Sequence, residues 1–304
     1  MTYSMVAHDP QTGELGVAIH SHFFGVGRIA GWARAGVGAV VTQAAAEKAH
    51  GPDGLDLLAA GRSPREAIDA LMEGDPGRAH RQLAMVAPGG GAAAYTGEAC
   101  LAQRGHRTRD HVSAQGNMLV SGRAWDAMVE AYAGSGGDLA ERLVAALDAA
   151  EATGGDARGV QSASLLVVGG PRTERAWDGV LVDVRVDDHP DPLPELRRLV
   201  GLNRFYDRLL DMLKEPGLLT GPATADPQRV ERALDDLAAG ERLLGANQEA
   251  TMWRGVLLAR TGQIDAGAAA LRDALARRPE LDGYLRQMSA AGDLAPEALP
   301  PAEA

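Results

Sequence analysis

The sequence predicts an α+β protein, built as a four-layer αββα sandwich and followed by a small all-helical domain. Up to about residue 186, apolar runs of strand length alternate with pairs of helical segments. These strands are apolar at nearly every position, as expected when both faces of a sheet are covered. Beyond that point helical periodicity takes over. A two-layer α+β domain is the alternative packing.

The first elements are expected to be two strands joined by a turn, at residues 3–7 and 14–19. An Asp-Pro pair followed by a glycine marks the turn between them. A third strand is expected at 37–42, and then a helix at 51–60. The next helix starts at Ser63, since a capping serine, a proline at the first helical position and a glutamate at the third form an N-terminal signature.

The middle of the chain repeats the same order of strands, helix pair and strands. A Pro-Gly-Gly-Gly turn separates two of the strands, and leucines and alanines at helical spacing mark the second helix of the pair. Strands are expected at 82–87, 92–96 and 111–116, helices at 122–133 and 138–152, and closing strands at 161–168 and 179–186.

The last third of the chain is expected to be helical. A helix over 193–213 leads into a linker rich in Gly, Pro and Thr, and the string from Trp253 to Pro279 fits one tetratricopeptide-type helical hairpin. One such hairpin cannot form a superhelix, so we expect it to pack on a neighbour or to mediate dimerisation. The expected domains are the sandwich, a helix with its linker, and a tetratricopeptide-like domain, at 1–200, 201–227 and 228–304.

Composition restricts the function. The 304 residues are 45% hydrophobic and carry a net charge of −11, so a basic surface for nucleic acid is not expected. No apolar run reaches the roughly 18 residues of a membrane span and no export signal precedes the first strand, so we expect a soluble, cytoplasmic protein that does not bind membranes. The single cysteine, Cys100, excludes an internal disulfide and is interpreted as a packed side chain.

Thr2 is the first candidate for catalysis. A small residue after Met1 allows aminopeptidases to remove that methionine, which leaves Thr2 with a free amine. The hydroxyl is then a nucleophile, and the amine of the same residue, with a reference pKa near ~8, accepts its proton. The alternative is an ordinary first residue of a strand.

Four strings of the sequence carry a resemblance to a known family. They lie in order at 2–18, 33–43, 115–119 and 155–163. In these strings the chain resembles an uncharacterised bacterial family (domain of unknown function 1028) that is grouped with the N-terminal nucleophile (Ntn) hydrolases. The resemblance spans residues 2 to about 200 and implies an αββα fold and, by analogy, amide-bond hydrolysis. A tetratricopeptide-like tail also occurs in some members of this family.

The more distant similarity to proteasome-type Ntn proteins implies further site residues. It places Thr2 as the nucleophile, with Ser21, Gln43 and Ser162 around it. The turn at Asn117 lies at the same end of the sheet. No lysine stands where the proteasome has one near its nucleophile; Trp32 or Arg34 occupies that neighbourhood.

Roles for these residues follow from their chemistry. The amide of Asn117 and a backbone N–H at Gln43 are suited to hold an oxyanion, and Ser162 to hydrogen-bond the amine. Asp156 either holds the ammonium or orients Arg158; the alternative is a surface ion pair in a loop. The predicted substrate-contacting residues are Ser21, His22, Thr42, Asp156 and Arg158.

A metal site is not expected. His20 and His22 lie on one side of a strand, but zinc takes three or four ligands and the other histidines are scattered. The glycine-rich segments lack the Lys-Ser/Thr pair of a phosphate loop.

The leading hypothesis is therefore a cytoplasmic Ntn-type amidohydrolase that cleaves a small amide or peptide-like bond through Thr2, without metal or organic cofactor. We expect a homodimer, formed through the C-terminal helices. One rival is a non-catalytic binding or assembly protein, favoured by the missing lysine and the helical tail. Another is a metal-assisted hydrolase centred on His20 and His22.

Overall fold

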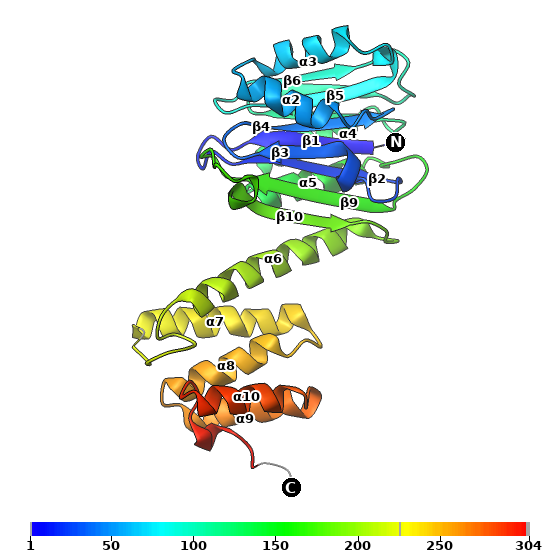
Figure 1. Cartoon of the computed structure of the whole chain (residues 1–304). Helices are drawn as coiled ribbons and strands as arrows, with labels where there is room; N and C mark the ends of the chain where they lie inside the picture. The colour runs from blue at the N-terminus through cyan, green and yellow to red at the C-terminus, as the bar shows by residue number, and fades with distance from the viewer. Residues whose placement is uncertain (1, 225, 302–304) are drawn as a thin grey trace. The chain divides into compact units, whose positions relative to one another are not determined.

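We describe the chain from a computed structural model, which covers residues 2–224 and 226–301 (Figure 1). The chain divides into two compact units, and the boundary between Val200 and Gly201 falls within helix α6 (Pro192–Lys214). The first unit contains all the strands that the described residues form, and the second is helical. The fold is therefore mixed, with two antiparallel sheets followed by helices.

The two sheets have six and four strands. The larger sheet has the order β10-β9-β2-β1-β8-β7 and the smaller one β3-β4-β5-β6, and all neighbours are antiparallel. The strands are β1 (Thr2–His8), β2 (Leu15–Ser21), β3 (Gly31–Arg34), β4 (Gly38–Ala44), β5 (Arg81–Val86), β6 (Ala92–Thr96), β7 (Gly105–Arg109), β8 (Val112–Asn117), β9 (Ser162–Val168) and β10 (Val180–Val186).

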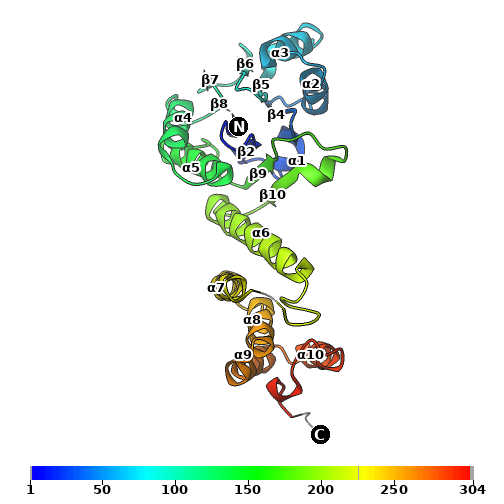
Figure 2. The ribbon, with the colours of Figure 1, turned by 90° about the vertical axis from the view of Figure 1, so that its left-hand side faces the viewer.

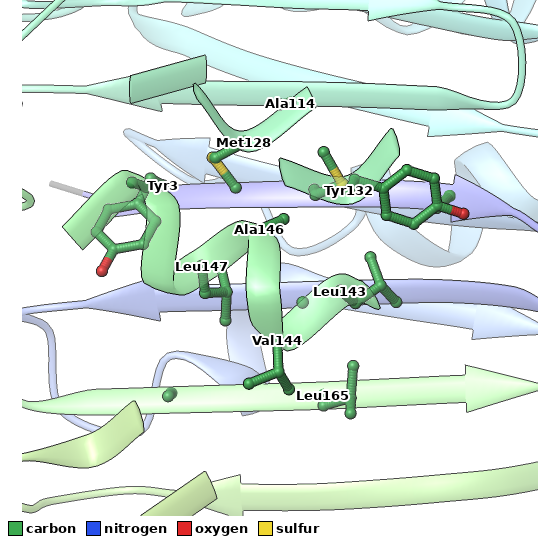
Figure 3. Close-up of a cluster of buried hydrophobic side chains, with 14 of the residues drawn as sticks. Tyr3, Ala114, Met128, Tyr132, Leu143, Val144, Ala146, Leu147 and Leu165 are labelled. Atoms are coloured by element: carbon green, nitrogen blue, oxygen red, sulfur yellow. The ribbon is translucent and has the colours of Figure 1, made fainter. Parts of the chain in front are cut away.

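Helices cover the outer face of each sheet. Helices α4 (Ala124–Gly134) and α5 (Leu139–Glu151) pack on the larger sheet, where Leu143 and Leu147 lie against Tyr3 and Leu165 (Figure 3). Helices α2 (His50–Ala59) and α3 (Pro64–Glu73) pack on the smaller sheet. Figure 2 shows the two helix pairs on opposite sides of the strands. The layers thus follow the order helices, sheet, sheet, helices.

The inner faces of the two sheets meet in a third core. Since side chains alternate along a strand, Val6, Val17 and Ile19 point away from α4 and α5 and toward Val41 and Val86 of the smaller sheet. Strands β1 and β2 are therefore buried on both faces, which explains their nearly continuous apolar sequences.

Local signals in the sequence explain the helix starts. Ser63 caps α3 and Asp138 caps α5, each in a capping box with the glutamate three residues later. The structure adds three elements that the sequence did not predict: α1 (Gly27–Ala30), β3 and β7. Helix α1 has only four residues, and β7 is a polar, mostly exposed edge strand, so neither shows apolar periodicity.

The second unit contains the end of α6 and helices α7 (Pro227–Leu244), α8 (Glu249–Arg260), α9 (Ile264–Arg277) and α10 (Leu281–Ala290). Glycines bring α8 and α9 close together: a Cβ on Gly267 would stand 2.7 Å from the carbonyl oxygen of Gly255. None of the helices in the described residues has the length and apolar character needed to cross a membrane.

Candidate active site

Four polar side chains form a row across the larger sheet, at the end where β1 begins. Thr2 pairs with Ser21 on one side and with Asn117 on the other, and Ser21 pairs with Ser162. Directly paired residues of neighbouring strands point to the same face. Here that face is the one that meets the smaller sheet, so the fold brings together four of the residues that the sequence singled out.

The hydroxyl groups of this row have defined partners. Thr2 Oγ1 lies 3.1 Å from Ser21 Oγ, and Ser21 Oγ also accepts a hydrogen bond from the Phe23 N–H at 3.0 Å. Ser162 Oγ donates to the Phe23 carbonyl at 2.5 Å and accepts from the Val26 N–H at 3.2 Å. Ser162 therefore fastens the loop after β2, and Ser21 is the hydroxyl that contacts Thr2.

A buried glutamine, Gln82 on β5, connects the two sheets. Its Oε1 accepts hydrogen bonds from Gln43 Nε2 at 2.7 Å and from Asn117 Nδ2 at 2.9 Å. Its Nε2 donates to the carbonyl oxygens of Gly105 and Gly116. Gln82 is fully buried, and these bonds satisfy it. It thereby fixes the orientation of the two amides nearest Thr2.

The network continues beneath Thr2. Gln43 Nε2 also contacts the backbone carbonyl of Thr2 at 3.3 Å, and Gln43 Oε1 accepts from Ser4 Oγ at 2.6 Å. Ser4 Oγ in turn accepts from Gln115 Nε2 at 2.7 Å. We call this set, Ser4, Gln43, Gln82, Gln115 and Asn117, the glutamine network. Side chains from β4, β5 and β8 thereby hold the first residues of β1 in place, on the face of the larger sheet that meets the smaller sheet.

A cavity of about 240 Å³ opens beside Asn117. Two of its lining residues lie at strand ends: Ala44 is the last residue of β4, and Met118 directly follows β8. Both have positive φ angles, 66° for Ala44 and 54° for Met118. Such left-handed backbone is rare for residues with a side chain and is concentrated at functional sites. Its other lining residues include Ala45, His80, Ala99, Cys100 and Leu101. Burial raises the pKa of the Cys100 thiol, which donates to the Arg81 carbonyl, in keeping with a packed cysteine.

The other predicted substrate contacts lie elsewhere. Thr42 points to the face of β4 covered by helices, where its Oγ1 donates to the Glu47 carbonyl. Asp156 accepts from the His22 N–H at 3.1 Å and pairs with Arg158, whose Nη2 lies 3.3 Å from its Oδ2. These contacts tie the loop after α5 to the loop after β2.

His20 lies on the opposite face of β2 from Ser21. Its ring is fully buried and stacks on Tyr3 at 4.8 Å, and neither ring nitrogen has a hydrogen-bond partner among the residues that the structure describes. Burial lowers the pKa of His20 to about 4. Tyr3 Oη donates to Glu151 at 2.6 Å, and its pKa is raised well above the usual value by burial and then by that carboxylate. Within the described ranges no three His, Cys, Asp or Glu side chains are grouped as a metal would require.

The sequence did not predict that the side chains of Ser4, Gln82 and Gln115 form a buried hydrogen-bond network. A signal was present for Gln82, a polar residue on a face of β5 that is otherwise apolar at Ala84 and Val86, whereas the corresponding faces of β1 and β8 carry other polar residues. A buried polar residue of this kind needs a partner, but the sequence does not say which strand supplies it.

These observations define the class of the protein: a mixed α/β protein whose two stacked antiparallel sheets enclose a polar site at one end. Within it, the chain belongs to the family of unknown function DUF1028, whose model matches residues 2–196. The crystal structure of a Silicibacter pomeroyi protein of this family is similar to the chain, with 35% sequence identity and a TM-score of 0.60; the match covers 66% of this chain and 88% of that one. No curated protein matches the chain.

The glutamine network predicts a large cost for removing Gln82. In Gln82→Leu, two amide donors and two carbonyl acceptors lose a buried partner, at about 1–3 kcal/mol for each orphaned group. We expect the free energy of unfolding, measured with urea, to fall by about 3 kcal/mol or more. The matched control is Gln11→Leu at an exposed turn position, where the change stays within ~0.5 kcal/mol. Equal stability of the two variants would contradict the role assigned to Gln82.

Burial of His20 predicts a stability that depends on pH. The folded pKa of about 4 lies below the ordinary 6.5, so the full stability is present above pH 6.5. Between pH 6.5 and about 4 only the unfolded chain binds the proton, and the free energy of unfolding falls by about 3 kcal/mol. His20→Phe keeps a ring against Tyr3 and removes this contribution.

The measurement is urea unfolding of both proteins at several pH values. His8, His50 and His106 also have lowered pKa values through burial, but they remain in both proteins, so the difference isolates His20. The prediction is refuted if the free energy of unfolding changes with pH between 6.5 and about 4 by the same amount in both proteins.

Proposed function

We propose that this protein is a cytoplasmic Ntn-type amidohydrolase, which cleaves a small amide or peptide-like bond through Thr2 after Met1 has been removed. Met1 itself lies outside the described residues. The observation that carries the proposal is the placement of Thr2. Its hydroxyl lies 3.1 Å from Ser21 Oγ, on a central strand, above the glutamine network and next to a residue that lines a cavity.

The chemistry assigns two steps to one residue. Thr2 Oγ attacks the amide carbon, and its proton passes to the free amine of Thr2, directly or through the hydroxyl of Ser21. The amine then protonates the leaving nitrogen as the C–N bond breaks, which leaves an ester on Thr2. Water attacks this ester with the same amine as base, and the acid is released. No cofactor takes part in these steps.

The oxyanion is assigned to Asn117 and to the backbone at Ala44. The Nδ2 of Asn117 carries two N–H groups, and Gln82 receives one of them, which holds the amide in place for the other. One oxyanion donor is worth about 2.7–4 kcal/mol of transition-state stabilisation. As in the sequence prediction, the donor in this region is a backbone N–H; the side chain of Gln43 hydrogen-bonds the Thr2 carbonyl and Gln82 instead.

The residues at the position of the proteasome lysine do not face Thr2. Trp32 packs on the helix-covered side of the smaller sheet, and Arg34 pairs with Asp56 at 2.9 Å. In our proposal the hydroxyl of Ser21, instead of a lysine, positions the proton that leaves the hydroxyl of Thr2. The layer order and the family resemblance support kinship with Ntn hydrolases, and the tight α8–α9 hairpin supports a tetratricopeptide-like unit.

The proposal includes a homodimer formed through the helices of residues 228–304. Within these helices, Tyr284 of α10 has a large side chain that is 43% exposed and available for a contact. Light scattering of the full chain should give twice its mass of 31.7 kDa. A monomer mass at micromolar concentration would contradict this part of the proposal.

The central test is the removal of the nucleophile. Intact-mass measurement should show the chain without Met1, and Thr2→Ala should lower the turnover of a cleaved amide by at least about 10³-fold. Thr2→Ser keeps a hydroxyl and an amine and should retain activity. The control is Thr12→Ala in the exposed β1–β2 turn, which should behave as the parent.

Retention of Met1, or equal turnover by the parent and Thr2→Ala, would sink the enzyme hypothesis. The non-catalytic binding or assembly protein would then be the better interpretation of the fold.

A further inference from the structure

The cavity beside Asn117 points to the class of substrate. We infer that it binds the acyl side chain of the substrate, and that this side chain is uncharged, apolar and no larger than about a phenyl or leucine group. The inference rests on the proposed function, because it assigns the cavity to the acyl part of the amide that Thr2 cleaves.

The position of the cavity selects the acyl part. Asn117 lines it and pairs directly with Thr2, and Ala44, which also lines it, follows Gln43, which contacts the Thr2 carbonyl. A carbonyl carbon attacked by Thr2 and held by Asn117 therefore lies at the cavity's edge. The group attached to that carbon continues into the cavity, while the leaving amine departs toward solvent.

The size of the cavity limits the group. Its volume of about 240 Å³ exceeds the ~150 Å³ cavity that accommodates benzene and is smaller than the ~300–1,000 Å³ of sites for drug-sized ligands. One side chain of leucine, methionine or phenylalanine size fills it, whereas a large fused ring system does not.

The walls of the cavity are mostly apolar and small. Three alanines, Ala44, Ala45 and Ala99, line it together with Leu101 and Met118; His80 and Asn117 are its polar side chains, and among the described residues that line it none is an Asp, Glu, Lys or Arg. A charged acyl group would lose water on entry and meet no carboxylate, lysine or arginine in this lining, which costs several kcal/mol. An apolar group gains roughly 25 cal/mol for each Å² that it buries.

The surroundings of the cavity have the same character. Leu101 is 60% exposed at its wall, and Val120 is 58% exposed two residues after Met118. Both residues lie in loops at the Thr2 end of the sheets. Large apolar side chains exposed around a hollow favour an apolar ligand.

The test uses a panel in which only the acyl side chain changes. N-acetyl-aminoacyl p-nitroanilides of Gly, Leu, Phe, Asp and Lys share one leaving amine and one reporter. We expect kcat/KM for the Leu and Phe compounds to exceed that for the Asp and Lys compounds by about 30-fold or more.

Cavity-filling variants connect this preference to the cavity. Ala99→Leu should lower the ratio of kcat/KM for Phe over Gly by about tenfold or more, since the added side chain occupies the space. Ala45→Leu, at an exposed position of the wall, tests the same space with less risk to folding. Ala133→Leu, on the exposed surface of α4, is the matched control and should leave the ratio unchanged.

The outcomes separate this inference from the proposed function. Cleavage that depends on Thr2 but prefers charged acyl groups, or keeps its ratio in both cavity variants, overturns the inference and leaves the hydrolase proposal standing. If no compound is cleaved, calorimetry with N-acetyl-leucinamide and N-acetyl-aspartamide decides. Tighter binding of the leucine compound, lost in Ala99→Leu and Ala45→Leu, supports the cavity assignment without the hydrolase; equal or absent binding overturns both.

Discussion

The hydrogen bonding of Gln82 between the two sheets is the interaction on which the rest of the structure depends. Buried amides are costly unless every donor and acceptor finds a partner, and Gln82 connects its own strand β5 to β4, β7 and β8 through such partners. A slip of one residue in β1 would turn Ser4 and Thr2 away from this network and toward the helices. The glutamine network therefore sets the register of β1, and with it the position of Thr2.

The space between the sheets is divided into two parts by this arrangement. At one end Val6, Val17 and Ile19 meet Val41 and Val86 in a dry core, and at the other the glutamine network replaces apolar packing. The apolar core stabilises the fold through burial. At the polar end, hydrogen bonds fix the orientation of the side chains, which apolar contacts alone leave adaptable. In the proposed function, the hydroxyl of Thr2 lies at the polar end, where hydrogen bonds fix its orientation.

The sequence predicted most strands and helices because their periodicity and caps are local properties. It also singled out Thr2, Ser21, Gln43 and Asn117, through a resemblance and through their places at strand ends, and the structure brings these residues together. It did not predict the role of Gln82, whose partners come from β4, β7 and β8, since pairing between distant strands leaves no local signal. Strand β7 was missed for the opposite reason: its Gly-His-Arg-Thr-Arg sequence is polar, and only pairing with β8 makes it a strand.

The backbone that lines the cavity is strained at two residues that follow members of the glutamine network. Ala44 and Met118 hold left-handed conformations that cost about 1–3 kcal/mol each, and such conformations persist only where the surroundings impose them. Here Ala44 follows Gln43 and Met118 follows Asn117, the two amides that Gln82 orients. The network thus holds both strained residues at the ends of its own strands. Strain at two residues that line one cavity, next to the Asn117 that pairs with Thr2, is the arrangement that the proposed function requires, because its backbone and side-chain donors must be fixed before a substrate arrives.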